Sequence, residues 1–353
     1  VLGCRPCKAA AATRSPSPAA RRSPSLSDSP ASTVPARHSP AGLLLRSAAG
    51  ALAARLVDLL VLVAVLLTLL FFALRLAGDP SIVLAGEDAD PETLAAIRVQ
   101  YGLDRPLPVQ YLTYLANVAR GDFGASLATG QPALPIVLAA VPATLLMAGL
   151  AMAFSLAVAI PLGVWLGAAG ERAGRRVVSG LVAVAQGVPG LVVALVLIQV
   201  FAVMLNWLPA LGHARPVHWI LPTLALGWFL VPKLARLVQA NVAEAMREDY
   251  VRTARAIGAH GGALVWRHAL PNALLGTVAL VAAQLGFLVS GAVVIETIFA
   301  WPGLGRLLVQ STVNLDFPVV QALVVVICAL VFAVNAVADL LFRVLDPRIR
   351  SGA

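Results

Sequence analysis

Runs of apolar residues alternate with shorter polar stretches along most of this chain. A helix crosses the hydrocarbon core of a bilayer with about 20 apolar residues, at a rise of about 1.5 Å for each residue. Six runs reach or approach this length, and we predict that each forms a transmembrane helix. Their approximate ranges are 56–77, 142–168, 177–205, 219–230, 273–294 and 319–341.

The sequence in or next to the second, third and fourth runs predicts further details of these helices. Residues 135–140 are apolar but too short to cross, so we expect an interfacial segment that leads into the second helix. The Gly-Val-Pro-Gly sequence at 187–190 predicts a kink in the third helix, because neighbouring membrane helices can satisfy the carbonyls that proline frees. The fourth run is short, and beyond Pro232 it continues through Lys233 and Arg236 as an increasingly polar helix.

The polar stretches divide the chain into five parts. Residues 1–45 are rich in Ala, Ser, Pro and Arg and lack periodicity, which is typical of a disordered tail. Residues 46–77 contain the first membrane helix, and residues 78–140 predict a water-exposed subdomain, in which Asp90 and Pro91 suit the start of a short helix. Residues 141–342 hold the other five helices with a long charged loop at 241–272, and residues 343–353 form a tail.

Composition supports a membrane protein. Of the 353 residues, 59% are hydrophobic and only 12% are charged, against about 25% charged in soluble domains. The net charge of +9 could suggest nucleic acid, but a basic groove needs soluble surface that is scarce here. Cys4 and Cys7 have a zinc-like spacing without a second ligand pair, so we predict no metal site.

Arginines are distributed unevenly between the loops. The loops that follow the second and fourth helices, together with the two ends of the chain, carry most of them. Because loops with excess Lys and Arg face the cytoplasm, we expect both termini and the loop at 241–272 to be cytoplasmic. The subdomain at 78–140 then lies outside.

The loop at 241–272 is the longest strongly charged interruption between membrane-length runs in the C-terminal half. Its first part contains good helix formers, and we expect one helix that leaves the membrane and reaches Ile257. Glu248 and Arg252 stand at i,i+4 in the order that favours an ion pair on a helix.

The second part of the loop predicts a bend followed by a short helix. Gly258 interrupts the first helix, and two further glycines follow it. Ala263, Trp266 and Leu270 lie at i, i+3 and i+7, which predicts one apolar stripe along the membrane surface. Pro271 is expected to end this helix before the fifth membrane helix begins.

Two interpretations of the loop remain open from these residues. In the first it is an ordinary connection, whose tryptophan anchors at the lipid headgroups and whose arginines set the topology. In the second it docks on another protein, which its residue types favour because Trp and Arg often anchor protein interfaces.

The loop resembles a known family. Arg252-Thr253-Ala254, Gly258 and the His-Ala-Leu-Pro sequence at 268–271 resemble the EAA loop of ATP-binding-cassette (ABC) importer permeases, and residues 249–258 resemble its version in peptide and nickel permeases. Arg252 replaces the Glu that names the loop, and His268 replaces the usual Ile. Further segments resemble the B-type subunit of dipeptide and oligopeptide permeases, at 78–80, 101–107, 121–124, 142–145, 296–305 and 346–350.

This resemblance implies an all-α membrane protein with six transmembrane helices, an extracytoplasmic subdomain between helices 1 and 2, and a cytoplasmic coupling helix between helices 4 and 5. It implies a pore half in the bacterial plasma (inner) membrane. The expected partners are a second homologous permease subunit, two ABC ATPase subunits or one fused ATPase, and an extracytoplasmic peptide-binding protein. The residues expected to transmit ATPase motion are Arg252, Thr253, Ala254, Arg255, Gly258, His260, Trp266, Arg267, His268, Leu270 and Pro271.

The chain itself carries no ATP-binding signature. It has two lysines, Lys8 and Lys233, and neither ends a GxxxxGK[ST] loop that would cradle phosphates. We therefore expect no cofactor on this chain, with ATP and Mg²⁺ in the partner subunits, and no enzymatic activity of its own.

The expected function is import of di- and oligopeptides, with nickel or glutathione as alternative substrates. An ion-coupled secondary transporter is the rival class, because such proteins place ionisable residues near the bilayer midplane. Asp58, Glu296 and Asp339 instead fall near the ends of their runs, where packing carboxylates are more common.

Overall fold

A computed structural model describes residues 40–77, 90–100, 104–168 and 173–345. Within these residues the chain is all-helical apart from one isolated β-bridge between Ala125 and Pro132. The chain divides into two units, Val1–Ala53 and Ala54–Ala353. In the first unit the structure describes only the start of the first helix, which continues into the second unit. This helix begins at Pro40, whereas the sequence predicted that the N-terminal tail extends to residue 45.

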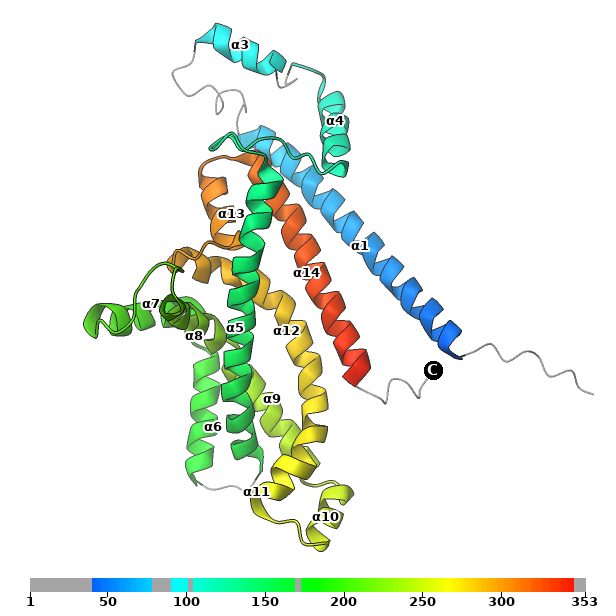
Figure 1. Cartoon of the computed structure of the whole chain (residues 1–353), viewed down its shortest axis with the longest axis vertical. Coiled ribbons are helices and arrows are strands. Elements are labelled where there is room, and N and C mark those ends of the chain that lie inside the picture. Colours follow the sequence, from blue (N-terminus) through cyan, green and yellow to red (C-terminus); the bar gives the residue numbers. More distant parts are fainter. Residues whose placement is uncertain (1–39, 78–89, 101–103, 169–172, 346–353) are drawn as a thin grey trace, which may run out of the picture. The chain divides into compact units, whose positions relative to one another are not determined.

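The described helices differ widely in length, from three to 38 residues (Figure 1). In chain order the helices are α1 (Pro40–Ala77), α3 (Pro91–Gln100), α4 (Leu107–Ala119), α5 (Ala133–Gly167), α6 (Ala173–Gln186), α7 (Gly190–Leu197), the π-helical η1 (Ile198–Met204), the 3-10 helix η2 (Pro216–Trp219), α8 (Ile220–Trp228), α9 (Leu230–Ala245), α10 (Asp249–Ala256), α11 (Gly261–Ala263), the π-helical η3 (Leu264–Ala269), α12 (Leu270–Ile298), α13 (Leu304–Val313) and α14 (Phe317–Leu345).

Among the described residues, four helices are long and apolar enough to cross a membrane, within α1, α5, α12 and α14. Two bent pairs also qualify, α6 with α7–η1 at 99° and η2–α8 with α9 at 52°, which gives six spans if each pair counts as one. The sharper bend falls at Gly187–Gly190, so the predicted kink in the third run is confirmed.

The second membrane helix starts earlier than predicted. Residues 135–140 belong to α5, which runs from Ala133 without a break, so the separate interfacial segment is wrong. Pro142 and Pro161 both lie inside this helix. Proline removes one backbone donor, but membrane helices tolerate this loss where neighbours and local adjustments satisfy the freed carbonyl.

Helix α5 packs closely on α9 through two glycines one turn apart. A Cβ at Gly163 would lie 2.6 Å from the Ala235 carbonyl oxygen, and a Cβ at Gly167 would lie 2.5 Å from the Gln239 carbonyl oxygen. Small residues at i and i+4 allow this approach, and dispersion between the closely packed backbones then stabilises the pair in lipid. The pair connects the membrane core to the loop that follows α9.

Glu296 near the end of α12 is completely buried at 0% exposure. Its carboxylate accepts hydrogen bonds from the Thr144 hydroxyl at 2.7 Å and from the Gly305 backbone N–H at 2.7 Å. Gly305 stands in the first turn of α13, so Glu296 caps that helix from a distance, and the helix N-terminus favours its negative charge. A packing role fits these contacts better than a proton relay.

Candidate functional site

The charged loop consists of separate helical pieces at the end of the bundle where α9 and α12 meet (Figure 1). Helix α9 ends at Ala245, and α10 begins at Asp249 after an extended Glu248 with φ −67° and ψ 151°. The single helix predicted to reach Ile257 is therefore wrong. The chain closes α9 with local bonds, such as the Arg247 N–H donating to the Glu244 carbonyl at 2.9 Å, and then starts a new helix.

Gly258 forms the predicted bend after α10. Its φ is +102°, in the region that favours glycine, and a Cβ there would meet nothing within 4 Å. The Gly258 N–H donates to the Arg255 carbonyl at 3.2 Å, and the Ala259 N–H donates to the Ala254 carbonyl at 3.0 Å. These two bonds form a Schellman motif with glycine just past the helix end, so the backbone conformation, and not lack of space, requires glycine.

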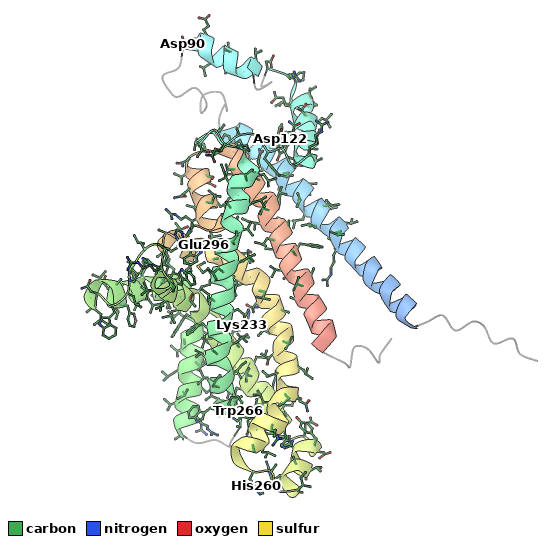
Figure 2. The ribbon with its side chains drawn as sticks, in the orientation of Figure 1. Asp90, Asp122, Lys233, His260, Trp266 and Glu296 are labelled. Atoms are coloured by element: carbon green, nitrogen blue, oxygen red, sulfur yellow. The ribbon has the colours of Figure 1, made fainter. Side chains whose placement is uncertain are left out.

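His260 follows the bend and folds back onto it. Its ring Nδ1 lies 2.6 Å from the Gly258 carbonyl oxygen, and its side chain remains exposed (Figure 2). This contact fixes the direction in which the chain leaves the bend before α11 begins.

The short helix after the bend buries a different stripe from the one predicted. Leu264 and Val265 are buried, and so are Ala269 and Leu270, five residues after each of them. A spacing of five matches the π-helical η3, in which hydrogen bonds join residues i and i+5. Ala263 and Trp266 therefore lie on the exposed side, and of the three predicted stripe residues only Leu270 is buried.

Pro271 does not separate the short helix from the fifth membrane helix. It stands in the first turn of α12, which follows η3 directly, so the predicted stop is wrong. Proline is tolerated in such a position because local adjustments such as a π-helical turn can satisfy the carbonyl that its missing N–H frees. The short helix and α12 therefore form one continuous helical path.

The buried side of the loop packs against the membrane helices. Val251 and Ala254 of α10 pack in one buried cluster with Leu264 and Leu270. The same cluster contains Val164 of α5 together with side chains of α9 and α12. We infer that displacement of the loop is transmitted to these helices, because interiors packed at this density resist compression.

The outer side of the loop carries most of the predicted docking residues. Arg255, Gly258, His260 and Arg267 are exposed, and Trp266 exposes 52% of its surface. His268 is half-buried, whereas Ala254 and Leu270 belong to the buried cluster, so they support the loop from below. An exposed tryptophan beside arginines is typical of a protein interface.

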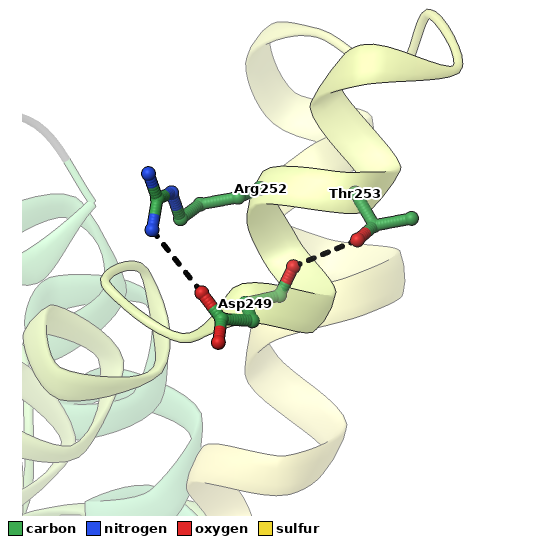
Figure 3. Close-up of polar contacts among 3 residues, drawn as sticks. All are labelled: Asp249, Arg252 and Thr253. Carbon is green, nitrogen blue, oxygen red and sulfur yellow. Dashed lines mark hydrogen bonds and ion pairs between the residues drawn. The ribbon is translucent and has the colours of Figure 1, made fainter. Parts of the chain in front are cut away.

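Arg252 forms an ion pair, although not with the predicted partner (Figure 3). Its Nη1 donates to Asp249 Oδ1 at 3.2 Å, and the Thr253 hydroxyl donates to the Asp249 carbonyl at 3.0 Å. Glu248 precedes α10 in extended conformation, so it cannot align with Arg252 at i,i+4. The predicted Glu248–Arg252 pair is wrong for this reason.

We expect Arg252→Gln to leave the stability of the protein nearly unchanged. The paired side chains of Arg252 and Asp249 are 72% and 94% exposed, and such pairs contribute at most about 0.5 kcal/mol. Melting in detergent measures this directly, with Asp249→Asn as the matched variant that breaks the same pair but keeps the arginine. A large fall in melting temperature with both variants would show that the pair is structural.

A hollow of about 520 Å³ adjoins the break between α9 and α10. Its lining includes Glu244, Arg247, Glu248 and Asp249. The sequence reasoning missed this hollow because it treated the two helices as one. Glu248 and Asp249 directly before the helical pattern are a signal that could have marked a new helix start, since acidic residues favour the first turn.

The geometry agrees with comparisons to known proteins. Residues 159–351 match the family model described as "Binding-protein-dependent transport system inner membrane component", and residues 43–157 match the model of that component's N-terminal region. The chain is 37% identical over 302 residues to the "Glutathione transport system permease protein GsiC" of Pectobacterium atrosepticum, covering 84% of this chain and 97% of that protein. The protein of the same name from Salmonella typhimurium is also 37% identical, over 300 residues, covering 84% of this chain and 96% of the relative.

The fold also matches a solved transporter. An inward-facing structure of the MetNI methionine ABC transporter superposes with a TM-score of 0.52 at 22% sequence identity. The match covers 60% of this chain and 96% of the solved one. At this identity the likeness establishes the fold alone.

Proposed function

The chain belongs to the inner membrane components of binding-protein-dependent transport systems, as a permease subunit of an ABC importer, and from this we propose that it carries di- and oligopeptides. The predicted family and the predicted all-α membrane fold are confirmed. As a transport subunit it is not an enzyme. The family match also decides between the two classes of transporter considered from the sequence, in favour of an ABC importer and against an ion-coupled secondary transporter.

Membership of this family implies ATPase and binding-protein partners. We propose that this chain pairs with a second homologous permease subunit, with two ABC ATPase subunits or one fused ATPase, and with an extracytoplasmic peptide-binding protein. ATP and Mg²⁺ are then held by the ATPases, and this chain binds no cofactor.

The apolar helices fit a multi-pass protein of the inner membrane. We propose that both termini and the loop at 241–272 face the cytoplasm, which the concentration of arginines on that loop supports. The subdomain containing α3 and α4 then faces outward.

The observation that carries the proposed mechanism is the two-sided loop. Its exposed side presents Trp266, Arg267 and His260, and its buried side is packed into the base of α5, α9 and α12. ATP-driven closure of the ATPases would move the docked side as a rigid body. The buried cluster would then pass that motion to the membrane helices and shift them between inward-open and outward-open states.

Glutathione is the second candidate substrate, because the two relatives described above are named for it. Glutathione is itself a tripeptide, although its first linkage uses the side-chain carboxyl of glutamate, so the two candidates share amide linkages and free carboxylates. The choice between them requires measured uptake.

Uptake by the reconstituted complex tests both candidates. Proteoliposomes containing the complete importer are supplied with its binding protein, ATP and a labelled dipeptide, tripeptide, glutathione or Ni²⁺. We expect ATP-dependent uptake of the short peptides, and the same vesicles without ATP are the control. Accumulation of Ni²⁺ alone would contradict the proposal, and accumulation of glutathione alone would select the second candidate.

A further inference from the structure

Two cations, Lys233 and Arg236, lie inside a segment of membrane length. Helices η2, α8 and α9 together qualify as one bent span, from Pro216 to Ala245. At about 1.5 Å per residue, Lys233 lies about 21 Å along the helical path from Trp219 and about 18 Å from Ala245, so it stands in the middle part of this segment. Figure 2 places it between Glu296 and the loop residue Trp266 along the bundle.

Both cations face away from the core of this chain. Phe229, Lys233, Arg236 and Ala240 repeat at helical spacing, and all except the half-buried Lys233 are exposed. The opposite face of α9 is buried, including Leu234 and Ala235 against α5. Within the described residues, the cations therefore lie on a face of α9 that is only partly covered: Arg236 is exposed, Lys233 is half-buried, and Phe229 contacts α12.

No acidic partner neutralises them within the described part of the chain. Neither Lys233 nor Arg236 makes an ion pair or hydrogen bond there. Glu296, the buried acid of α12, uses its carboxylate on Thr144 and the first turn of α13. An ammonium group inside a membrane segment is costly without a counter-charge or water, so the arrangement points to a negative group from outside the described helices.

An aromatic pair lies beside the cations. The rings of Phe229 and Phe287 stack with centroids 5.1 Å apart and an interplanar angle of 21°. Both rings remain partly exposed, at 39% and 50%. Phe229 stands one helical turn before Lys233. The two stacked rings, one between α8 and α9 and one on α12, therefore form an apolar surface next to the charges of Lys233 and Arg236.

We propose that Lys233 and Arg236 form a transient carboxylate site on the translocation path, which receives the free carboxylate of a passing peptide while an apolar side chain contacts the Phe229–Phe287 pair. This inference rests on the proposed peptide substrate. Short peptides combine a terminal carboxylate with a variable side chain, so two cations beside aromatic rings suit peptides in general and do not select one sequence.

Uptake of two substrates that differ in one charge tests this site. Proteoliposomes carry the complete importer with Lys233→Met, and they receive a tripeptide with either a free C-terminal carboxylate or a C-terminal amide. The ratio of variant to wild-type uptake is measured for each, so that any preference of the binding protein cancels. Lys233→Arg, which keeps the charge, and Arg215→Gln, which removes an exposed charge outside the described helices, are the controls.

We expect Lys233→Met to lower uptake of the carboxylate peptide about tenfold while uptake of the amide changes less than about twofold, because only the carboxylate forms an ion pair with the ammonium group, and a hydrogen bond between two charged groups is stronger than one to a neutral amide. Lys233→Arg should retain most uptake of both. An equal fall for both peptides would overturn the proposal and assign Lys233 to topology, a lipid phosphate or an acid of the second permease subunit. Absence of uptake of any peptide by the wild-type importer would instead refute the proposed function.

Discussion

Replacing Gly258 by leucine is expected to lower ATP-driven uptake at least tenfold while the ATPases continue to hydrolyse ATP. Gly258 has φ of +102°, and a residue with a Cβ is strained there by about 1–3 kcal/mol. The bend would relax to another conformation, and the exposed side of the loop would change its angle relative to its buried side. Since 1.4 kcal/mol corresponds to a factor of ten, the strain is large enough to depopulate the docking geometry.

Gly262→Leu is the matched control for this result. Gly262 lies four residues further on, is also exposed, and does not have positive φ. Its Cβ would approach only the Trp266 ring, at 4.0 Å. Equal loss of coupling in both variants would show that bulk on this surface matters and that the backbone conformation of Gly258 does not.

The second large effect is expected at the contact between α5 and α9. Gly163→Leu places a Cβ 2.6 Å from both the Ala235 carbonyl oxygen and the Val238 Cβ, and neither can move without shifting α9. We expect a cost of about 3 kcal/mol and a sharp loss of folded protein. Size-exclusion chromatography and thermal melting in detergent measure this loss.

Gly149→Leu is the comparison for the helix contact, because Gly149 lies on the same helix and a Cβ there meets nothing within 4 Å. It should fold with a melting temperature close to that of the wild type. A similar loss in both variants would mean that leucine is unfavourable anywhere in α5, which would remove the close contact as the explanation.

The membrane helices could be predicted from the sequence because apolar length alone determines them. Within the described residues, all six predicted runs overlap helices or bent helix pairs of membrane length. The start of α5 was misplaced because Pro142 suggests a helix boundary, whereas the helix continues through it. Local preference for a break at proline is weaker than the need to keep backbone groups bonded in lipid.

The loop shows where sequence reasoning fails. Gly258 was predicted as the bend, because glycine is the usual residue past a helix end. The stripe of Ala263, Trp266 and Leu270 was wrong because an α-helical period was assumed, and η3 is π-helical. Nothing in the residue types of this segment distinguishes the two periods, so the exposure of Trp266 depended on the structure.

Close approaches between distant segments were also outside the reach of the sequence. Gly163 and Gly167 form a GxxxG spacing that suggests a helix contact, but α9 as the partner follows only from the fold. The same holds for Glu296, whose carboxylate lies on the first turn of α13 and on Thr144 of α5.

Contact between the loop and an ATPase subunit is the most direct test of the central claim. A photo-reactive benzoylphenylalanine at position 260 is irradiated in the complete importer, with the same residue at the exposed Val177 of α6 as the control. We predict a cross-link to the ATPase from position 260, at a yield that changes when ATP is bound, and little or none from position 177. Cross-linking from position 260 only to lipid, or equally from both positions, would contradict the account.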